Sequence, residues 1–197
     1  MKVYDISQEI LSCEVYPGDP IPSLKPLERM SEGSLYNLSA VYMCVHNGTH
    51  CDAPSHFKAD GKTIDQLSPE SFVGNTYVAS CEGNVSGEDA KRILENAKRN
   101  HDDSYRRILI KGDAEVTEAA AEVFAGSGIV LLGNESQSVG PLKNPVEVHK
   151  ILLEKEVVLL EGIRLKDVPE GFYILCAAPL NIQGAEGSPC RAVLISK

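Results

Sequence analysis

Basic residues are scarce in this chain of 197 residues, in which 19 lysines and arginines stand against 28 aspartates and glutamates. The net charge of −9, with no basic cluster to offset it, argues against a nucleic-acid or anionic-membrane partner. No apolar run approaches the length needed to cross a bilayer, and the N-terminus has neither a signal-peptide core nor a transit-peptide character. We therefore expect a cytoplasmic location.

Closely paired cysteines are also missing. The six cysteines are scattered without a CxxC motif, so we expect reduced thiols rather than a disulfide framework. No low-complexity tract, internal repeat or linker interrupts a composition of 43% hydrophobic and 24% charged residues. These values predict one globular domain over residues 1–197, long enough to bury a substantial core.

The hydrophobic pattern alternates between strand-like and helix-like segments. A capping box at Ser86 opens a predicted helix, and a proline at the first helical position opens another after Asn144. We expect helices over residues 86–100, 117–125 and 144–154, and strands over residues 2–7, 35–46, 76–81, 107–111, 128–132, 157–160, 172–178 and 191–196. The mixture predicts an α/β fold with a predominantly β centre.

Histidine is concentrated in one short segment. Residues 46–56 read HNGTHCDAPSH and hold three of the five histidines together with Asp52. The turn signal Asn47-Gly48 can make His46 and His50 face each other, and an extended segment after it points His50 and Asp52 the same way. Imidazoles and carboxylates hold divalent metals such as Zn²⁺, with Mn²⁺ or Fe²⁺ also possible. This pattern alone does not distinguish ligands from a general base such as His56.

Two later residues are candidates to complete such a site. His149 lies on the stripe of the third predicted helix that is expected to face inward. Glu161 ends an apolar strand, where a buried carboxylate is costly unless it is paired or bound to metal. Cys44 and Cys51 flank the histidine cluster and are weaker candidates, since free cysteine usually behaves as a small buried hydrophobe.

The chain resembles the cyclase-like family of metal-dependent hydrolases that includes bacterial kynurenine formamidase. The resemblance rests on the motif His46-x-Gly-Thr-His50-x-Asp52-Ala-Pro-x-His56-Phe57. It extends to residues 5–7, 17–19, 160–162, 178–180 and 187–192, and so runs over nearly the whole chain.

The resemblance implies a role for each residue of the motif. It makes His46, His50 and Asp52 ligands of one metal, with Asp52 bridging to a second metal held by His149 and Glu161. Two Zn²⁺ ions per chain are implied, Mn²⁺ being the alternative, and His56 is the acid/base rather than a ligand. The implied fold is a swivelling β/β/α type with about three helices, assembled as a homodimer or larger homo-oligomer.

The sequence departs from the family pattern at three positions. Members commonly carry Asp-x-x-Ser-Val-Asp after the central strand, where this chain has Glu135 first and Gly140 last. The loop before Pro17 often carries a tryptophan, and here it is Tyr16 in a chain without any tryptophan. These positions lie near where the family shapes its substrate pocket or its oligomer contacts, so the metal chemistry is better supported than the substrate.

The leading hypothesis is hydrolysis of a small amide, formamide or cyclic imide by metal-activated water, with His56 moving a proton. The resemblance implies N-formyl-L-kynurenine as substrate, giving kynurenine and formate. Tyr16 and Phe57 are expected to bind its arene, with Phe72 as a further candidate. Three alternatives stay open, namely an isatin-like lactam or lactone hydrolase, a metal-binding protein without turnover, and an amidase that uses Cys51 or Cys190 as nucleophile.

Overall fold

The computed structural model describes residues 1–100 and 102–196, and its centre is a mixed nine-stranded sheet. In spatial order the strands are β1 (Val3–Asp5), β13 (Val193–Ser196), β11 (Gly171–Cys176), β5 (Val73–Ser80), β7 (Arg107–Lys111), β9 (Leu131–Asn134), β10 (Val158–Glu161), β4 (His50–Asp52) and β12 (Gly187–Pro189). The middle strands β5, β7, β9 and β10 run parallel to one another, and the strands toward both edges pair antiparallel.

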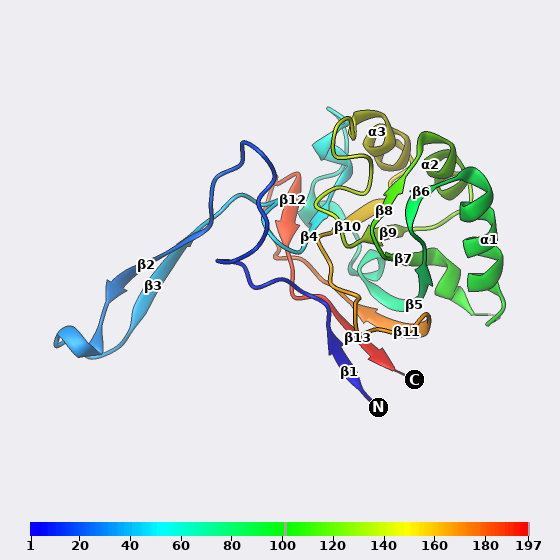
Figure 1. Cartoon of the computed structure of the whole chain (residues 1–197). Helices are drawn as coiled ribbons and strands as arrows, with labels where there is room; N and C mark the ends of the chain where they lie inside the picture. Colours follow the sequence, from blue (N-terminus) through cyan, green and yellow to red (C-terminus); the bar gives the residue numbers. More distant parts are fainter. Residues whose placement is uncertain (101, 197) are drawn as a thin grey trace.

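Three helices, α1 (Gly87–Lys98), α2 (Glu118–Ala125) and α3 (Val146–Glu154), gather on one side of the sheet (Figure 1). Their apolar stripes pack against side chains such as Ile108 and Ile110 of β7. The intervening Leu109 packs into a second core on the opposite face of the sheet. Both faces of the central strands are therefore buried, as is typical of parallel strands. The expected α/β fold with a β centre and three helices is confirmed.

A two-stranded hairpin of β2 (Ser23–Glu28) and β3 (Leu38–Tyr42), here called the arm, projects away from the sheet (Figure 1). The predicted strand over residues 35–46 is therefore wrong in length, since it ends at Tyr42 and His46 lies in the turn that follows. Its alternating apolar residues lie on one face of the hairpin. Leu38, Ala40 and Tyr42 are all exposed, because no part of the described chain packs over that face.

Most other predicted elements are present with shifted ends. The capping box of Ser86 and Asp89 opens α1 as expected. The predicted strand over residues 128–132 instead starts at Leu131, because Gly128 has a left-handed φ of 82° that a strand does not accept. α3 starts at Val146 rather than at Pro145. The small parallel pair of β6 (Gly83–Val85) and β8 (Ala114–Val116) has no counterpart among the predicted strands.

Within the described ranges, no helix has the length and apolar character that crossing a membrane requires.

Candidate metal centre

β4 and β10 present three ionisable side chains on one face of the sheet. The strands pair antiparallel, with Glu161 opposite His50 and Leu159 opposite Asp52. Because side chains alternate along a strand, His50 and Asp52 share a face, and Cys51 between them points into the second core. The expected alignment of His50 with Asp52 is confirmed, and Glu161 joins them from the neighbouring strand.

The tight turn before β4 positions His46. Asn47 closes this turn, because its N–H donates to the Cys44 carbonyl and its Oδ1 accepts from the Cys44 N–H. Gly48 has a left-handed φ of 66°, and a Cβ there would lie 2.8 Å from Ile10 Cδ1, so glycine is required on both counts. The rings of His46 and His50 meet edge to face at 5.2 Å, as the Asn47-Gly48 turn predicts.

His149 reaches the same place from α3. It lies on the buried face of the helix with Leu152 and Leu153 and is only 3% exposed. Its Nδ1 lies 2.9 Å from the carbonyl oxygen of Pro145, one helical turn earlier. This contact turns Nε2 toward the carboxylates of β4 and β10. The expectation that His149 lies on the inward-facing stripe of the helix is confirmed.

Asp52 lies between two groups of these residues. Its Oδ1 is 2.9 Å from His46 Nδ1 and 3.4 Å from His50 Nε2, whereas its Oδ2 is 3.7 Å from His149 Nε2. Glu161 contacts His149 at 3.2 Å and His50 at 3.4 Å. In each group, His46–His50–Asp52 and Asp52–His149–Glu161, the candidate ligand atoms lie within 4.8 Å of one another. The five residues expected to bind metal are therefore brought together, with Asp52 common to both groups.

Contacts with neighbouring histidines keep the carboxylates of Asp52 and Glu161 ionised. Burial would raise the pKa of Asp52, but its contacts with His46 and His50 hold that pKa well below the usual range. For Glu161, burial and the Asp52 charge raise the pKa, and His149 and His50 outweigh them and lower it. Burial would likewise lower the pKa of His149, yet Glu161 and Asp52 raise it to about 9. Both carboxylates are therefore ionised at a buried position, each paired with histidines.

The donor set fits a divalent transition metal. Asp52 Oδ2 is buried without a hydrogen-bond partner, which is costly in the absence of a cation. His50 and His149 both direct Nδ1 to a backbone carbonyl, at 3.0 Å from Gly48 and 2.9 Å from Pro145. Metal-binding histidines use such contacts to fix the tautomer that leaves Nε2 free as a ligand. His46 differs, because its Nδ1 faces Asp52 and its Nε2 lies 3.3 Å from Glu186 without forming a hydrogen bond.

A cavity of about 330 Å³ opens directly over this cluster. It is lined by Tyr16, Asp19, His46, His50, His56, Phe57, Gln137, Ser138, Pro145, Val146, His149 and Glu161. The eight leading candidates from the sequence, namely His56, the five proposed ligands, Tyr16 and Phe57, thus lie in or beneath one cavity, with only Asp52 absent from the lining because it is fully buried.

His56 sits at the edge of the metal cluster rather than inside it. The three-residue turn Pro54–His56 brings it back over the site, and its ring stacks on His46 at 4.2 Å with a tilt of 32°. Phe57 contacts both His56 and His149, at 4.5 and 4.9 Å between ring centres. Burial lowers the pKa of His56 against the opposing charge of Asp52, so this histidine is a neutral imidazole near pH 7.

The remaining aromatic and thiol candidates lie elsewhere. Phe72 is 2% exposed in the second core and does not line this cavity, so its suggested stacking role is wrong. Cys51 is fully buried in the same core, and contact with Cys190 and burial raise its pKa well above the usual value. An activated nucleophile requires the opposite shift. Cys44 and Cys190 also lie outside the cavity lining.

Several residues of the site were missed by sequence reasoning. Gln137 and Ser138 line the cavity from the loop after β9, and Asp19 lines it from the N-terminal loop. Glu186 lies beside His46. The signals available were the Ser-Val pair at residues 138–139 and the Pro-Gly-Asp loop at residues 17–19, both of which belong to the family motifs without an assigned role.

The departures at residues 135 and 140 have structural explanations. The Glu135 carboxylate points away from the metal cluster and accepts hydrogen bonds from the N–H groups of Gly112 and Leu165, at 2.8 and 2.7 Å. Gly140 packs against the start of α3, where a Cβ would lie 3.0 Å from Val148 Cβ. The two positions therefore shape the frame of the loop, and neither supplies a metal ligand here.

Comparison with known proteins places this geometry in a family. The family model described as "Putative cyclase" matches residues 4–141, and the chain belongs to this cyclase family. A curated relative, the kynurenine formamidase of Erythrobacter litoralis, is 33% identical over 98% of this chain and 93% of its own.

Solved structures agree with this assignment. A protein described as a predicted metal-dependent hydrolase from Bacillus stearothermophilus is 27% identical, with a TM-score of 0.78 over 98% of this chain and 97% of its own. Isatin hydrolase A from Labrenzia aggregata has the same fold, with a TM-score of 0.83 at 19% identity over 100% of this chain and 94% of its own. The expected family and enzyme class, a hydrolase, are confirmed.

Proposed function

We propose that this protein is a metal-dependent amide hydrolase that cleaves an aryl formamide, with N-formyl-L-kynurenine as the substrate and kynurenine and formate as products. The observation that carries the proposal is the shared position of Asp52 between His46–His50 and His149–Glu161, at the floor of a cavity whose wall holds His56. The identity to kynurenine formamidases over nearly the full length of both chains supports the substrate.

His46, His50 and Asp52 would hold one metal, and Asp52, His149 and Glu161 a second, with Zn²⁺ favoured and Mn²⁺ as the alternative. When bound, such ions supply Lewis acidity and make water available as a nucleophile at neutral pH. The chain's own residues set the conditions for this. The backbone carbonyls of Gly48 and Pro145 orient His50 and His149, and the Val139 N–H donates to Glu161 at 2.7 Å.

His56 is the proposed acid/base. It is a half-buried neutral imidazole that lines the cavity and stacks on His46, so it can accept a proton from the attacking water. It then delivers that proton to the nitrogen that leaves as an aniline. The tilted contact with His46 and the edge-to-face contact with Phe57 limit the movement of the ring, which favours directed proton transfer.

Tyr16 and Phe57 are the proposed aromatic contacts of the substrate arene. Both line the cavity, and the Tyr16 hydroxyl donates to the Leu142 carbonyl at 3.4 Å, which fixes the ring at the cavity edge. A tyrosine stacks on an arene as a tryptophan does, with less contact area. The substitution at this position is therefore compatible with an aromatic substrate.

The function is tested by assaying the metal-loaded protein with N-formyl-L-kynurenine and with isatin, each against a metal-depleted control. We expect metal-dependent release of formate from the first substrate and little hydrolysis of the second. Preferential hydrolysis of isatin would replace the formamidase by the lactam hydrolase that the fold also supports. Absence of turnover with both would remove the aryl-formamide assignment.

We also propose that the protein is a homo-oligomer, a dimer or tetramer, of single-domain chains spanning residues 1–197. The support is the arm, whose exposed apolar side chains include Leu24, Leu35, Tyr36, Val41 and Tyr42. An isolated two-stranded hairpin is marginally stable in water, so this surface favours burial against a second copy. The six free cysteines favour a reducing compartment, and we propose the cytoplasm.

A further inference from the structure

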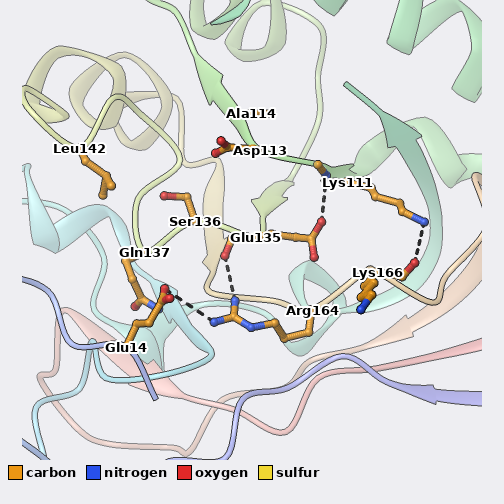
Figure 2. A pocket seen from close by; sticks show the side chains of 11 residues that line it. Glu14, Lys111, Asp113, Ala114, Glu135, Ser136, Gln137, Leu142, Arg164 and Lys166 are labelled. Atoms are coloured by element: carbon orange, nitrogen blue, oxygen red, sulfur yellow. Dashed lines mark hydrogen bonds and ion pairs between the residues drawn. The ribbon is translucent and has the colours of Figure 1, made fainter. Parts of the chain in front are cut away.

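A second cavity lies beside the cavity over the metal cluster, here called the metal cavity, and the two share one lining residue. This charged cavity, defined by Glu14, Asp113, Leu142, Arg164 and Lys166 among its lining, measures about 620 Å³ and is open to solvent. Gln137 lines both it and the metal cavity. Figure 2 shows Gln137 at one end of the charged cavity, beside Glu14 and Arg164, with Lys166 toward the other end.

The same two loops form the wall of both cavities. The N-terminal loop contributes Glu14 to the charged cavity and Tyr16 to the metal cavity. The loop after β9 contributes Leu142 to the first and Ser138 to the second. The Tyr16 hydroxyl and the Leu142 carbonyl join the loops at 3.4 Å. The two cavities therefore lie next to each other along the same pair of loops, with Gln137 between them.

The side-chain amide of Gln137 has unpaired hydrogen-bonding groups, which favours ligand binding at this position. Both its Oε1 and its Nε2 are buried, and neither has a hydrogen-bond partner among the described residues. Ser138 Oγ, next along the loop, is in the same state. An unpaired buried amide is costly, and a polar group of a ligand that spans the two cavities would satisfy it.

Past Gln137 in the charged cavity, the Arg164 guanidinium and the Glu14 carboxylate form a loose ion pair. Arg164 Nη2 lies 3.8 Å from Glu14 Oε2, while Arg164 Nη1 donates at 3.0 Å to the Glu135 carbonyl. The side chains of Arg164 and Glu14 remain 39% and 77% exposed. The guanidinium is thus held in place by the backbone but keeps donors free, and a carboxylate is their natural partner.

We propose that the substrate site extends past Gln137 into the charged cavity, where Arg164 binds the carboxylate and Glu14 the ammonium of a zwitterionic amino-acid end of the substrate. This rests on the proposed formamidase function, because the formamide must lie over the metal cluster. The paired opposite charges select a zwitterion over a simple anion or cation. The Gln137 amide pairs with a polar group in the connecting chain.

The test compares two substrates that differ only at this end. One is N-formyl-L-kynurenine, and the other is 2-formamidoacetophenone, which keeps the aryl formamide and the ketone but lacks the amino-acid group. Wild type is expected to favour the zwitterion in kcat/KM by about tenfold or more, as two charge-assisted contacts predict. Glu14→Gln should lower that preference by about five- to tenfold through KM, with kcat/KM for the uncharged substrate unchanged.

Matched variants lie in the same cavity. Lys166→Gln and Asp113→Asn remove exposed charges of either sign that form no ion pair with Glu14 or Arg164 within the described residues, and both should retain the wild-type preference. Arg164→Gln should abolish the preference, with thermal unfolding measured because Arg164 also bonds the backbone. Glu14 is exposed, so Glu14→Gln tests the proposal even where the Arg164 variant fails to fold.

The outcomes separate the two proposals. Equal wild-type kcat/KM for the two substrates, or a Glu14→Gln preference equal to wild type, overturns the extended site and leaves the formamidase standing. A loss of preference in Lys166→Gln as large as in Glu14→Gln also overturns it, since the effect would then be general electrostatics. No hydrolysis of either substrate by the wild type overturns both.

Discussion

Each oxygen of the Asp52 carboxylate faces a different set of histidines. Oδ1 faces His46 and His50, whereas Oδ2, which lacks a hydrogen-bond partner, faces His149. A single residue therefore joins a local motif to a helix about a hundred positions downstream. Removing its carboxylate would leave three histidines around an empty space, which explains why Asp52 is the most informative position for mutation.

His56→Ala tests the division between ligands and acid/base. A general acid/base contributes on the order of 10²–10⁴-fold to the rate, so kcat should fall by about that factor. Metal content, measured by mass spectrometry on the same sample, should stay at the wild-type value because His56 belongs to neither ligand group. Loss of metal with loss of activity would instead make His56 a ligand, and unchanged kcat would remove it from the mechanism.

The metal-free protein should lose stability as the pH rises above neutrality. His149 has its pKa raised from 6.5 to about 9, so its ion pair with Glu161 contributes fully below about pH 6.5. That contribution disappears as the pH passes through about 9, because the folded state gives up a proton that the unfolded state has already lost. His46 and His50, also shifted upward, act in the same direction.

The check is thermal unfolding of the chelated protein between pH 6 and pH 9.5. Tm is expected to fall across this range, and the fall should be smaller in His149→Gln. Metal affinity should change in the opposite sense and weaken toward low pH, because protons compete for the same nitrogens. A metal-free Tm that rises with pH would contradict the assigned charge states.

At the scale of elements, the close contact between the loop after β9 and α3 holds His149 in position. Gly140 permits this contact, with Val148 Cβ 3.0 Å and Pro145 Cα 3.3 Å from where a Cβ would stand. Gly140→Asp, which restores the common family residue, should cost about 1–3 kcal/mol of unfolding free energy and displace the start of α3. Urea unfolding measures this, with Ser136→Asp as a control in the same loop. A neutral Gly140→Asp would show that the loop adjusts freely.

The elements that sequence reasoning predicted well are those whose signal is local. The Ser86 capping box, the inward stripe of α3 and the period-two alignment of His50 with Asp52 all depend on neighbours within a few residues. Glu161 was found because a carboxylate at the end of an apolar strand is unusual. Its position opposite His50 depends on strand pairing across more than a hundred residues, which no local pattern encodes.

The arm and Gln137 show where local reasoning fails. The alternation around Leu38 and Tyr42 correctly predicts a strand with an apolar face, but this face is exposed because nothing in the described chain covers it. Gln137 carries no pattern of its own. Its role follows only from an amide buried without a partner, which requires three-dimensional information.

At the scale of the whole molecule, the arm predicts self-association. Tyr42→Glu should weaken assembly about tenfold or more, because burying a charge in an apolar contact is unfavourable. Leu180→Glu is the matched control, since Leu180 is 60% exposed outside the arm and Tyr42 is 66% exposed within it. Sedimentation velocity over a concentration series measures the shift. A monomeric wild type, or equal effects of the two variants, would contradict association through the arm.

The proposed mechanism depends most on two metals that share Asp52, and the decisive measurement is the metal content per chain. Wild type, Asp52→Ala and His149→Ala are loaded with Zn²⁺, desalted and analysed by mass spectrometry, with folding checked by circular dichroism. The shared two-metal site predicts about two equivalents in wild type, a loss from both positions in folded Asp52→Ala, and a smaller loss in His149→Ala. One equivalent in wild type that His149→Ala retains in full would contradict it.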